Sequence, residues 1–383
     1  MDMNLNDILL SELHSLEQVH LRRTLRAVEE GLNFAANDYL GLSRHPALIE
    51  AAQQATAKLG TGAGASRLVT GTTDAVLELE QELASWKETQ EALVFSSGYA
   101  AALGTIPALV GKGDTVVLDK LAHASLIDGA RLSGAMVRVF PHNQMPKLES
   151  LLQKLSAAPD RSRILVVTES IFSMDGDAAL LREIVELKER YGAWLMVDEA
   201  HATGLHGATG AGLLAELGLS SRVEVVMGTL SKALGSVGGY IAGPSPLIQW
   251  LINRGRSFIY STALPPGVIA ASRAAVEIAR GPEGAALRTR LRDNITHFHA
   301  GLPTAWKNEN LSSSAIQPLL CGEAAQALHL ATALRKKGFL IPAIRYPTVP
   351  RNAARLRVTL SASHLTKDID ALNEALAIAF PSK

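Results

Sequence analysis

The sequence predicts an α/β fold: a large domain with a mainly parallel sheet covered by helices, and a smaller α+β domain at the C-terminus. Two observations support this prediction. Short apolar runs alternate with helical patterns between residues 92 and 242, which is typical of parallel strands joined by crossover helices. A break then follows at Gly281-Pro282, after which the pattern becomes helix, strand, helix, strand.

The N-terminal segment is expected to be an arm rather than a domain. Residues 7–29 are predicted to form a polar, amphipathic helix, because apolar side chains recur there at helical spacing. A short extended piece over residues 32–34 follows, and the arm as a whole is predicted to span residues 1–44. The apolar positions of the helix are Leu9, Leu10, Leu13, Leu16 and Val19.

The large domain is predicted to span residues 45–281. Its strands are expected to be continuous apolar runs, because both faces of a parallel sheet are covered. Pro265-Pro266 then opens an alanine-rich helix that runs to about Arg280, and the small domain is predicted over residues 282–383. The strand candidates are residues 92–95, 115–118, 136–140, 164–168, 194–197, 223–227 and 240–242.

Composition narrows the class of function. The chain has 383 residues, 47% of them hydrophobic, and a formal net charge of zero with dispersed basic residues. This charge distribution disfavours nucleic acid and membrane surfaces as partners. The single cysteine, Cys321, cannot form an intrachain disulfide, and neither a signal peptide nor a membrane-spanning run is recognisable. We therefore expect a cytoplasmic protein that acts on small molecules.

Lys232 is the most informative residue. It lies in the run Thr229 to Gly235, just after the apolar stretch 223–227. A lysine in a loop is more often a solvated surface residue. A lysine among small residues at the end of a buried strand is instead suited to form an imine with an aldehyde cofactor. Pyridoxal phosphate is the cofactor that this placement indicates.

Asp198 supports this interpretation. It ends the apolar run 194–197, so we expect it at the carboxyl edge of the sheet, where ligands of open α/β sheets bind. A buried carboxylate next to the pyridine nitrogen of the cofactor keeps that nitrogen protonated. The attraction between the two charges favours the protonated ring by about 4 kcal/mol, at a separation of about 4 Å and an effective dielectric near 20. The protonated ring withdraws the electrons that such chemistry releases.

A phosphate site is predicted where a strand ends in Ser96-Ser97-Gly98 and a helix begins, because free amides at a helix start bind a dianion. An ordinary strand-to-helix turn is the alternative. The glycine-rich run from Gly60 to Arg67 lacks the Lys-Ser/Thr ending of a nucleotide P-loop, and no clear strand precedes it. We interpret this run as a flexible turn near the cofactor.

Three polar residues are further candidates for the cofactor site. His201 and Ser173 could reach the phenolic oxygen of the cofactor, and His123, at a predicted helix start, could stack on its ring. Taken singly, such residues are more often caps or core residues. A metal site at His201 and His206 is disfavoured, because no third ligand has suitable spacing. No nucleophile elbow supports a serine hydrolase.

Together these runs resemble the α-oxoamine synthase family of fold-type I pyridoxal-phosphate enzymes. The segments around Lys232 and Asp198 carry the resemblance, and it extends over nearly the whole chain. The loop Gly62-Ala63-Gly64-Ala65-Ser66 departs from the commoner Gly-Ser-Gly-Gly-Ser form, which leaves a backbone role there but no assured side-chain role. The other matching segments are residues 34–42, 172–177, 259–262, 314–319 and 343–350.

The resemblance implies roles at the cofactor. Lys232 would bind the cofactor and later act as a base, Asp198 would hold the pyridine nitrogen, and His123 would stack on the ring. His201 and Ser173 would lie on the phenolic side. The implied phosphate ligands are Gly98, Tyr99 and Thr229, completed across a homodimer interface by Tyr260, Ser261 and Thr262.

The resemblance also implies the substrates. Arg357 would bind the amino acid carboxylate through two hydrogen bonds, and Arg22 and Thr348 would contact the acyl substrate, with Arg23 as the alternative to Arg22. Segments 314–319 and 343–350 resemble the branch that joins L-alanine to a pimeloyl thioester on coenzyme A or an acyl carrier protein. Branches that use glycine or serine, and an inactive partner subunit, are the alternatives.

Overall fold

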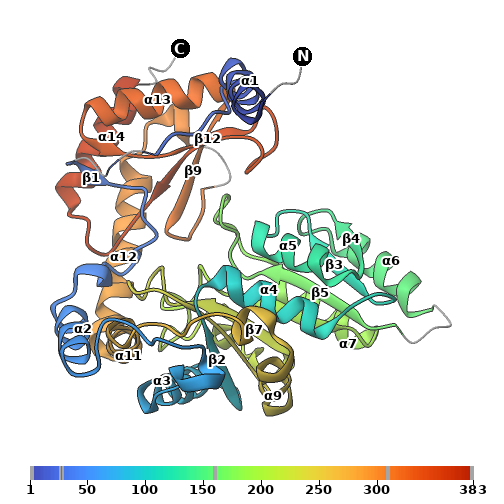
Figure 1. The fold of residues 1–383 in the computed structure, drawn as a ribbon. Helices are drawn as coiled ribbons and strands as arrows, with labels where there is room; N and C mark the ends of the chain where they lie inside the picture. Colours follow the sequence, from blue (N-terminus) through green and yellow to red (C-terminus); the bar gives the residue numbers. More distant parts are fainter. Residues whose placement is uncertain (1–3, 26, 28–29, 158–161, 308–310, 380–383) are drawn as a thin grey trace. The chain divides into compact units, whose positions relative to one another are not determined.

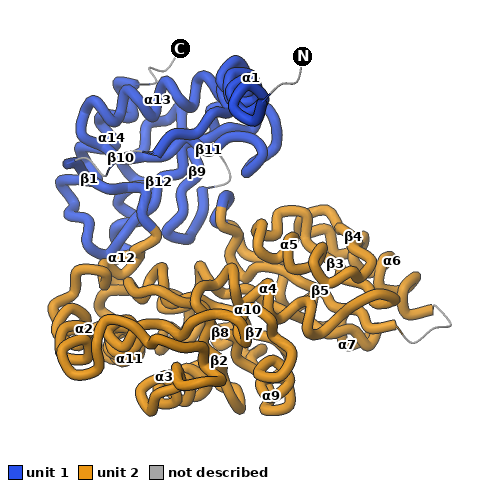
Figure 2. Tube along the Cα trace, viewed as in Figure 1, with its two compact units in different colours: residues 1–36, 174–176, 292–383 blue, residues 37–173, 177–291 orange. Residues whose placement is uncertain are grey.

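The computed structural model describes residues 4–25, 27, 30–157, 162–307 and 311–379. The chain divides into two compact units, coloured separately in Figure 2. Unit 1 comprises residues 1–36, 174–176 and 292–383, and unit 2 comprises residues 37–173 and 177–291. The domain boundaries predicted after residues 44 and 281 stay predictions.

Unit 2 is built on a sheet with helices packed around it (Figure 1). The sheet has seven strands in the order β2-β8-β7-β6-β5-β3-β4. β8 runs antiparallel to its neighbours β2 and β7, and the remaining neighbours are parallel. The predicted fold class, α/β with a mainly parallel sheet, is therefore confirmed. The strands are β2 (Glu91–Phe95), β3 (Thr115–Asp119), β4 (Met136–Phe140), β5 (Ile164–Glu169), β6 (Trp194–Asp198), β7 (Val225–Thr229) and β8 (Gly239–Gly243).

Helices cover this sheet. α4 packs against β2, β7 and β8 and against α5, while α3 packs against β2 and α11 against α2. The predicted alanine-rich helix is α11, and Gly281 separates it from α12. The helices that begin in unit 2 are α2 (Pro46–Leu59), α3 (Asp74–Trp86), α4 (Gly98–Leu109), α5 (Ala124–Ser133), α6 (Met145–Ser156), α7 (Leu181–Arg190), α8 (Leu213–Glu216), α9 (Ser245–Arg254), α10 (Arg256–Ile259), α11 (Pro266–Arg280) and α12 (Pro282–Gly301). Short helical turns are η1 (Leu42–Arg44), η2 (Arg67–Gly71) and η3 (Ser220–Arg222).

The core of unit 2 explains why the sequences of its strands are unbroken runs of apolar residues. Every residue of β3, β5, β7 and β8 is buried. Side chains from the sheet and from α4, α5 and α9 form one cluster, which includes Leu93, Ile106, Leu126, Val167 and Leu251. Burial of each such side chain contributes about 1.5–3 kcal/mol. The polar residues at the strand ends are thus held on a rigid support.

Unit 1 has mixed α+β structure. Its sheets are a three-stranded one with the order β11-β12-β9, whose neighbours are antiparallel, and a two-stranded one of β1 and β10, which are parallel. α13 packs against β9, β12 and α14. Its further elements are α1 (Leu5–Gln18), β1 (Leu32–Asn33), η4 (Thr304–Trp306), β9 (Ile316–Gly322), α13 (Ala324–Lys336), β10 (Phe339–Leu340), β11 (Ala343–Ile344), β12 (Ala354–Thr359) and α14 (Thr366–Ala379).

The predicted N-terminal helix over residues 7–29 is wrong at its C-terminal end. α1 spans Leu5–Gln18, and residues 26, 28 and 29 lie outside the described residues. The helix ends because His20 adopts a left-handed φ of 57° and the amide of Leu21 donates to the carbonyl of Leu16 at 2.8 Å. These bonds satisfy carbonyls of the last turn, as in a common C-terminal cap. The apolar spacing on which the prediction rested did not contain this stop signal.

None of the helices among the described residues is both long enough and apolar enough to cross a membrane.

Candidate active site

The candidate site lies where adjacent parallel strands of unit 2 end. Glu169 ends β5, Asp198 ends β6 and Thr229 ends β7. In the sheet register Glu169 pairs with Asp198, and Asp198 pairs with Met227 of β7. Since the carboxyl ends of parallel strands share one edge, these residues come together there, as the sequence predicted for Asp198.

A short loop presents Lys232 at this edge. After β7 the chain turns back on itself, because the amide of Leu230 donates to the carbonyl of Gly238 at 2.9 Å. Gly235 has a φ of +62°, and a Cβ there would lie 2.3 Å from the backbone nitrogen of Ser43. Only glycine combines this conformation with so close an approach. The position of Lys232 is thus set by the backbone on both sides.

Lys232, His201 and Tyr39 form a hydrogen-bonded chain. Lys232 Nζ lies 2.8 Å from His201 Nε2, and His201 Nδ1 lies 2.5 Å from the hydroxyl of Tyr39. The Tyr39 hydroxyl also donates to Asn37 Oδ1 at 3.1 Å. One proton arrangement satisfies every contact: Tyr39 donates to Asn37, Nδ1 of His201 donates to Tyr39, and Nε2 accepts from the Lys232 ammonium. The chain therefore orients the lysine amine.

Asp198 is a buried acceptor beside this amine. Its side chain is 5% exposed, and Oδ1 accepts the amide of Ala200 at 2.8 Å. Desolvation raises the pKa of Asp198, while the Lys232 ammonium and the Ala200 amide act in the opposite direction. A ligand that brings a cationic nitrogen to this carboxylate would relieve the cost of its burial.

A buried ion pair supports the turn after Asp198. Lys87 Nζ donates to Glu199 Oε2 at 2.8 Å and to the hydroxyl of Thr203 at 3.1 Å. The other oxygen of Glu199 accepts the amide of Leu214 at 2.8 Å. Both charged side chains are at most 2% exposed. Because neither charge can reach water, the pair fixes the backbone between Asp198 and His201.

The start of α4 provides free hydrogen-bond donors. Ser97 caps the helix by accepting the amide of Ala100 at 3.0 Å. Among the described residues, no acceptor contacts the amides of Gly98 and Tyr99. A Cβ on Gly98 would lie 3.9 Å from Oγ1 of Thr229, so the helix start and the end of β7 are neighbours. The predicted phosphate ligands Gly98, Tyr99 and Thr229 therefore lie together.

His123 and Ser173 approach the same edge from two loops. His123 caps α5, with Nδ1 2.8 Å from the hydroxyl of Ser125 and 3.2 Å from its amide. Desolvation lowers the pKa of His123; the Asp198 carboxylate opposes this effect, and the Lys232 ammonium adds to it. Ser173 is buried, and its backbone amide, like that of His123, faces the carboxyl group of Glu169. Glu169 thus links the two loops.

The residues implied for the substrates belong to unit 1. Arg357 lies on β12, is 4% exposed and donates to the Thr359 hydroxyl at 3.0 Å. Arg22 pairs with Glu17 at 2.8 Å on the surface, whereas a nitrogen of Arg23 lies 3.5 Å from the hydroxyl of Thr348. Within unit 1, Arg23 rather than Arg22 is therefore the neighbour of Thr348.

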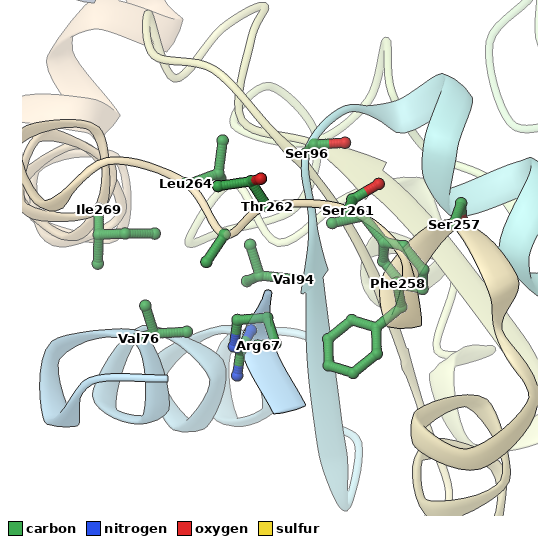
Figure 3. A pocket seen from close by; sticks show the side chains of 12 residues that line it. Arg67, Val76, Val94, Ser96, Ser257, Phe258, Ser261, Thr262, Leu264 and Ile269 are labelled. Atoms are coloured by element: carbon green, nitrogen blue, oxygen red, sulfur yellow. The ribbon is translucent and has the colours of Figure 1, made fainter. Parts of the chain in front are cut away.

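Tyr260, Ser261 and Thr262 follow α10. Tyr260 is 71% exposed and lies under the Arg256 guanidinium, whereas Ser261 and Thr262 line a cavity of about 20 Å³. In Figure 3, Arg67 and Phe258 lie on one side of this cavity, and Ser96, Ser261 and Thr262 lie on the other. Arg67, which ends the glycine-rich run, is held by two hydrogen bonds to Glu80, at 2.8 and 3.0 Å.

Comparison with known proteins identifies the family to which the chain belongs. The model of the family described as aminotransferase class I and II matches residues 29–376. The chain belongs to the aminotransferase class I and II family. The matched residues include the whole sheet of unit 2 and Lys232 at its carboxyl edge.

Curated members of the family are similar to the chain over nearly its whole length. The 8-amino-7-oxononanoate synthase of Geobacter sulfurreducens is 46% identical over 378 residues, covering 96% of each chain. That of Methylococcus capsulatus is 45% identical over 384 residues, covering 98% of each. The resemblance to the α-oxoamine synthases, and to this branch of them, is therefore confirmed.

Solved structures support the fold. A serine palmitoyltransferase structure with a PLP internal aldimine superposes with a TM-score of 0.90 at 30% identity, covering 98% of each chain. The 8-amino-7-oxononanoate synthase of Francisella tularensis gives a TM-score of 0.75 at 28% identity, covering 91% of this chain and 97% of that one.

Three residues of this aminotransferase-family site were not predicted from sequence: Tyr39, Lys87 and Glu169. Glu169 had a usable signal, because it ends an apolar run just as Asp198 does. Tyr39 lies in a segment that contributed to the resemblance but carried no chemical signal of its own. Lys87 had none, because its partner Glu199 is 112 residues away in sequence.

Proposed function

We propose that this chain has 8-amino-7-oxononanoate synthase activity. It joins L-alanine to a pimeloyl thioester and releases carbon dioxide and the free thiol carrier, as a step of biotin biosynthesis. The relatives at 45–46% identity over nearly the full length carry this proposal. The group formed by Lys232 with the buried side chains of His201 and Asp198 supports it, because this chemistry needs an amine and a carboxylate at one ligand site.

Pyridoxal 5′-phosphate is the cofactor, and the residues of unit 2 fit its functional groups. The Lys232 amine suits the aldehyde, and the buried carboxylate of Asp198 suits the ring nitrogen. The free amides of Gly98 and Tyr99 suit the phosphate. When bound, this cofactor supplies an aldehyde that condenses with amines and a ring that withdraws electrons from the amino acid Cα.

Lys232 has two tasks in this proposal. Its amine would hold the cofactor through the aldehyde, and the same amine, when free, would accept the proton from Cα of alanine. His201 keeps this amine in position through the contact at 2.8 Å. Such positioned proton transfer contributes about 10²–10⁴-fold to a rate. The buried carboxylate of Asp198 would favour a proton on the ring nitrogen.

The remaining side chains of unit 2 bind and orient. His123 would stack on the ring and donate a hydrogen bond to the acyl oxygen as charge develops there. Ser173 and His201 would lie at the phenolic oxygen of the cofactor. Thr229, next to the start of α4, joins Gly98 and Tyr99 in binding the phosphate.

Arg357 binds the carboxylate of alanine with its planar guanidinium. Arg22 and Thr348 contact the pimeloyl substrate, with Arg23 as the alternative supported by its contact to Thr348. Tyr260, Ser261 and Thr262 complete the phosphate site of a second copy in a homodimer. Coenzyme A and an acyl carrier protein are both candidate acyl carriers, and the cytoplasm is the proposed location.

One observation favours a second candidate. The superposition on serine palmitoyltransferase, at a TM-score of 0.90, is closer than that on the Francisella enzyme, at 0.75. Backbone similarity is shared by a whole family, whereas substrate choice depends on side chains. The 45–46% identity to 8-amino-7-oxononanoate synthases, against 30% to serine palmitoyltransferase, therefore carries more weight.

A substrate matrix tests the proposal. The purified chain, loaded with pyridoxal phosphate, is offered alanine, glycine or serine with pimeloyl, acetyl, succinyl or palmitoyl thioesters, and carbon dioxide and thiol release are measured. Alanine with the pimeloyl thioester should give the highest kcat/KM. Preference for serine with palmitoyl thioester, or for glycine with either short chain, would assign the chain to a sibling activity. If no pair of amino acid and thioester released carbon dioxide or thiol, the inactive partner subunit would be the remaining interpretation.

A further inference from the structure

Glu169 is a buried acid to which the proposed function gives no role. It ends β5, is 2% exposed, and lies beside Asp198 in the sheet register. Its Oε1 atom is buried and has no hydrogen-bond partner among the described residues. A buried carboxylate oxygen without a partner is unfavourable, so the state of this group requires an explanation.

The groups around Glu169 come from four elements. Asp198 at the end of β6 and Lys232 after β7 are the charges that face it. The backbone amides of His123, before α5, and of Ser173, after β5, donate towards its carboxyl group. Two buried carboxyl groups therefore face the same half-buried ammonium, and two adjacent negative charges at such a place are not stable together.

The two acids are not equivalent. Asp198 Oδ1 has a hydrogen bond from the amide of Ala200 at 2.8 Å, and the Lys232 ammonium and His123 both favour its ionised form. Glu169 instead has one oxygen without a donor, which is where an acid proton can reside. Burial, followed by the charge of Asp198, raises the pKa of Glu169 well above its ordinary value, and these two effects outweigh the Lys232 ammonium and the amides of His123 and Ser173, which act to lower it.

We propose that Glu169 is a positioning residue that stays a neutral acid, holds the loops of His123 and Ser173 against β5, and leaves Asp198 as the single negative charge at the cofactor ring. This inference rests on the proposed function for the identity of the cofactor. Its carboxyl carbonyl accepts the amides that place His123 on the ring and Ser173 at the phenolic oxygen. Its proton prevents a second charge from competing for the Lys232 ammonium.

Infrared spectroscopy tests the protonation state directly. A neutral acid has a carbonyl stretch that a carboxylate lacks, so the wild-type spectrum at pH 7.5 should contain this band and that of Glu169→Gln should not. Glu17→Gln, which removes a carboxylate that is 61% exposed, is the matched control and should remove carboxylate bands while leaving the acid band. A wild-type-minus-Glu169→Gln difference that shows only lost carboxylate bands would overturn the proposal.

Cofactor affinity tests the positioning role. Glu169→Gln keeps a carbonyl for the two amides, so its dissociation constant for pyridoxal phosphate should stay within about threefold of wild type. Glu169→Leu removes the acceptor and should weaken binding about tenfold, as the loss of one such hydrogen bond predicts. Equal affinity of the leucine variant, once circular dichroism has shown it folded, would overturn the positioning role. If the leucine variant does not fold, the infrared difference and the cofactor affinity of Glu169→Gln decide whether the proposal holds.

The two proposals fail separately. If the wild-type chain took up no pyridoxal phosphate, the proposed function would fail, and the infrared difference of the cofactor-free chain would still decide the state of Glu169. If the wild type bound cofactor and turned over substrate while Glu169 proved ionised, only this inference would fail.

Discussion

Lys232 Nζ lies 2.8 Å from His201 Nε2, although the two residues are 31 positions apart in sequence. The contact exists because β6 and β7 are adjacent parallel strands and each residue follows the carboxyl end of one of them. The buried hydroxyl of Tyr39 holds the far side of the imidazole. The reactive amine is thus oriented by side chains that cannot move into solvent.

Replacing Lys232 by alanine should retain the fold and lower kcat by about a thousandfold or more, because the chain loses its cofactor anchor and its base. Carbon dioxide release measures the rate, and borohydride reduction with peptide mapping measures cofactor attachment. Lys112→Ala, at an exposed lysine of unit 2, is the control. Full turnover by the Lys232 variant would contradict the assignment.

Replacing Tyr39 by phenylalanine should lower kcat about tenfold and the free energy of unfolding by about 1–2 kcal/mol. The buried His201 nitrogen then loses its partner at 2.5 Å. Steady-state kinetics and urea unfolding measure the two effects. Tyr191→Phe, which removes a hydroxyl at 3.3 Å from Glu149, should show neither effect. Equal losses in both variants would exclude a specific role for Tyr39.

Replacing Lys87 by methionine should lower the free energy of unfolding by about 3–5 kcal/mol, because Glu199 would remain buried without its counter-charge. Adding Glu199→Gln should recover more than half of this loss, since a neutral amide can still accept the Leu214 amide. Urea unfolding of the single and double variants measures the coupling. A loss below about 1 kcal/mol in the single variant would mean that water reaches the pair.

His142 should make stability depend on pH. Desolvation lowers its pKa, but hydrogen bonds to Asp119 at 3.0 Å and Asp177 at 2.7 Å outweigh this effect and raise the pKa to about 10. The folded pKa lies above the ordinary value of 6.5, so this stabilisation is complete below about pH 6.5 and is lost as the pH rises towards 10.

The free energy of unfolding should therefore fall by about 2 kcal/mol more in wild type than in His142→Gln between pH 7 and 9.5. This free energy is well below the value that the whole rise in the pKa of His142 would give, because the side chain is 21% exposed and solvent screens its interaction with the two aspartates. Urea unfolding at several pH values measures the difference. Parallel pH profiles would show that His142 is not held in its charged form.

The fold was predictable because its signal is local. The buried strands β3, β5 and β7 are continuous apolar runs, and Gly281 separates α11 from α12, which begins at Pro282. The end of α1 was missed because a left-handed His20 carries no apolar signal. Asp198 and Lys232 were predicted because each ends or follows a strand whose burial can be read from composition.

Tyr39 and Lys87 were missed for another reason. Each acts through a partner far away in sequence, and spacing along the chain does not reveal such pairs. Glu169 ends an apolar run, so its place at the sheet edge was readable from the sequence, but its pairing with Asp198 was not. The neighbour of Thr348 is a similar case: Arg22 and Arg23 are equivalent as sequence, and only packing in unit 1 brings Arg23 to that hydroxyl.

The sequence by itself determined the class of the fold, the carboxyl edge as the site, and the amine and carboxylate that define the cofactor. The burial of the strands follows from the local apolar pattern, and the chemistry follows from residue type. Only the tertiary structure decided which groups share protons there, because hydrogen bonding and desolvation depend on distances between strands. The pairing of Lys232 with His201, and of Asp198 with Glu169, is a property of the assembled sheet.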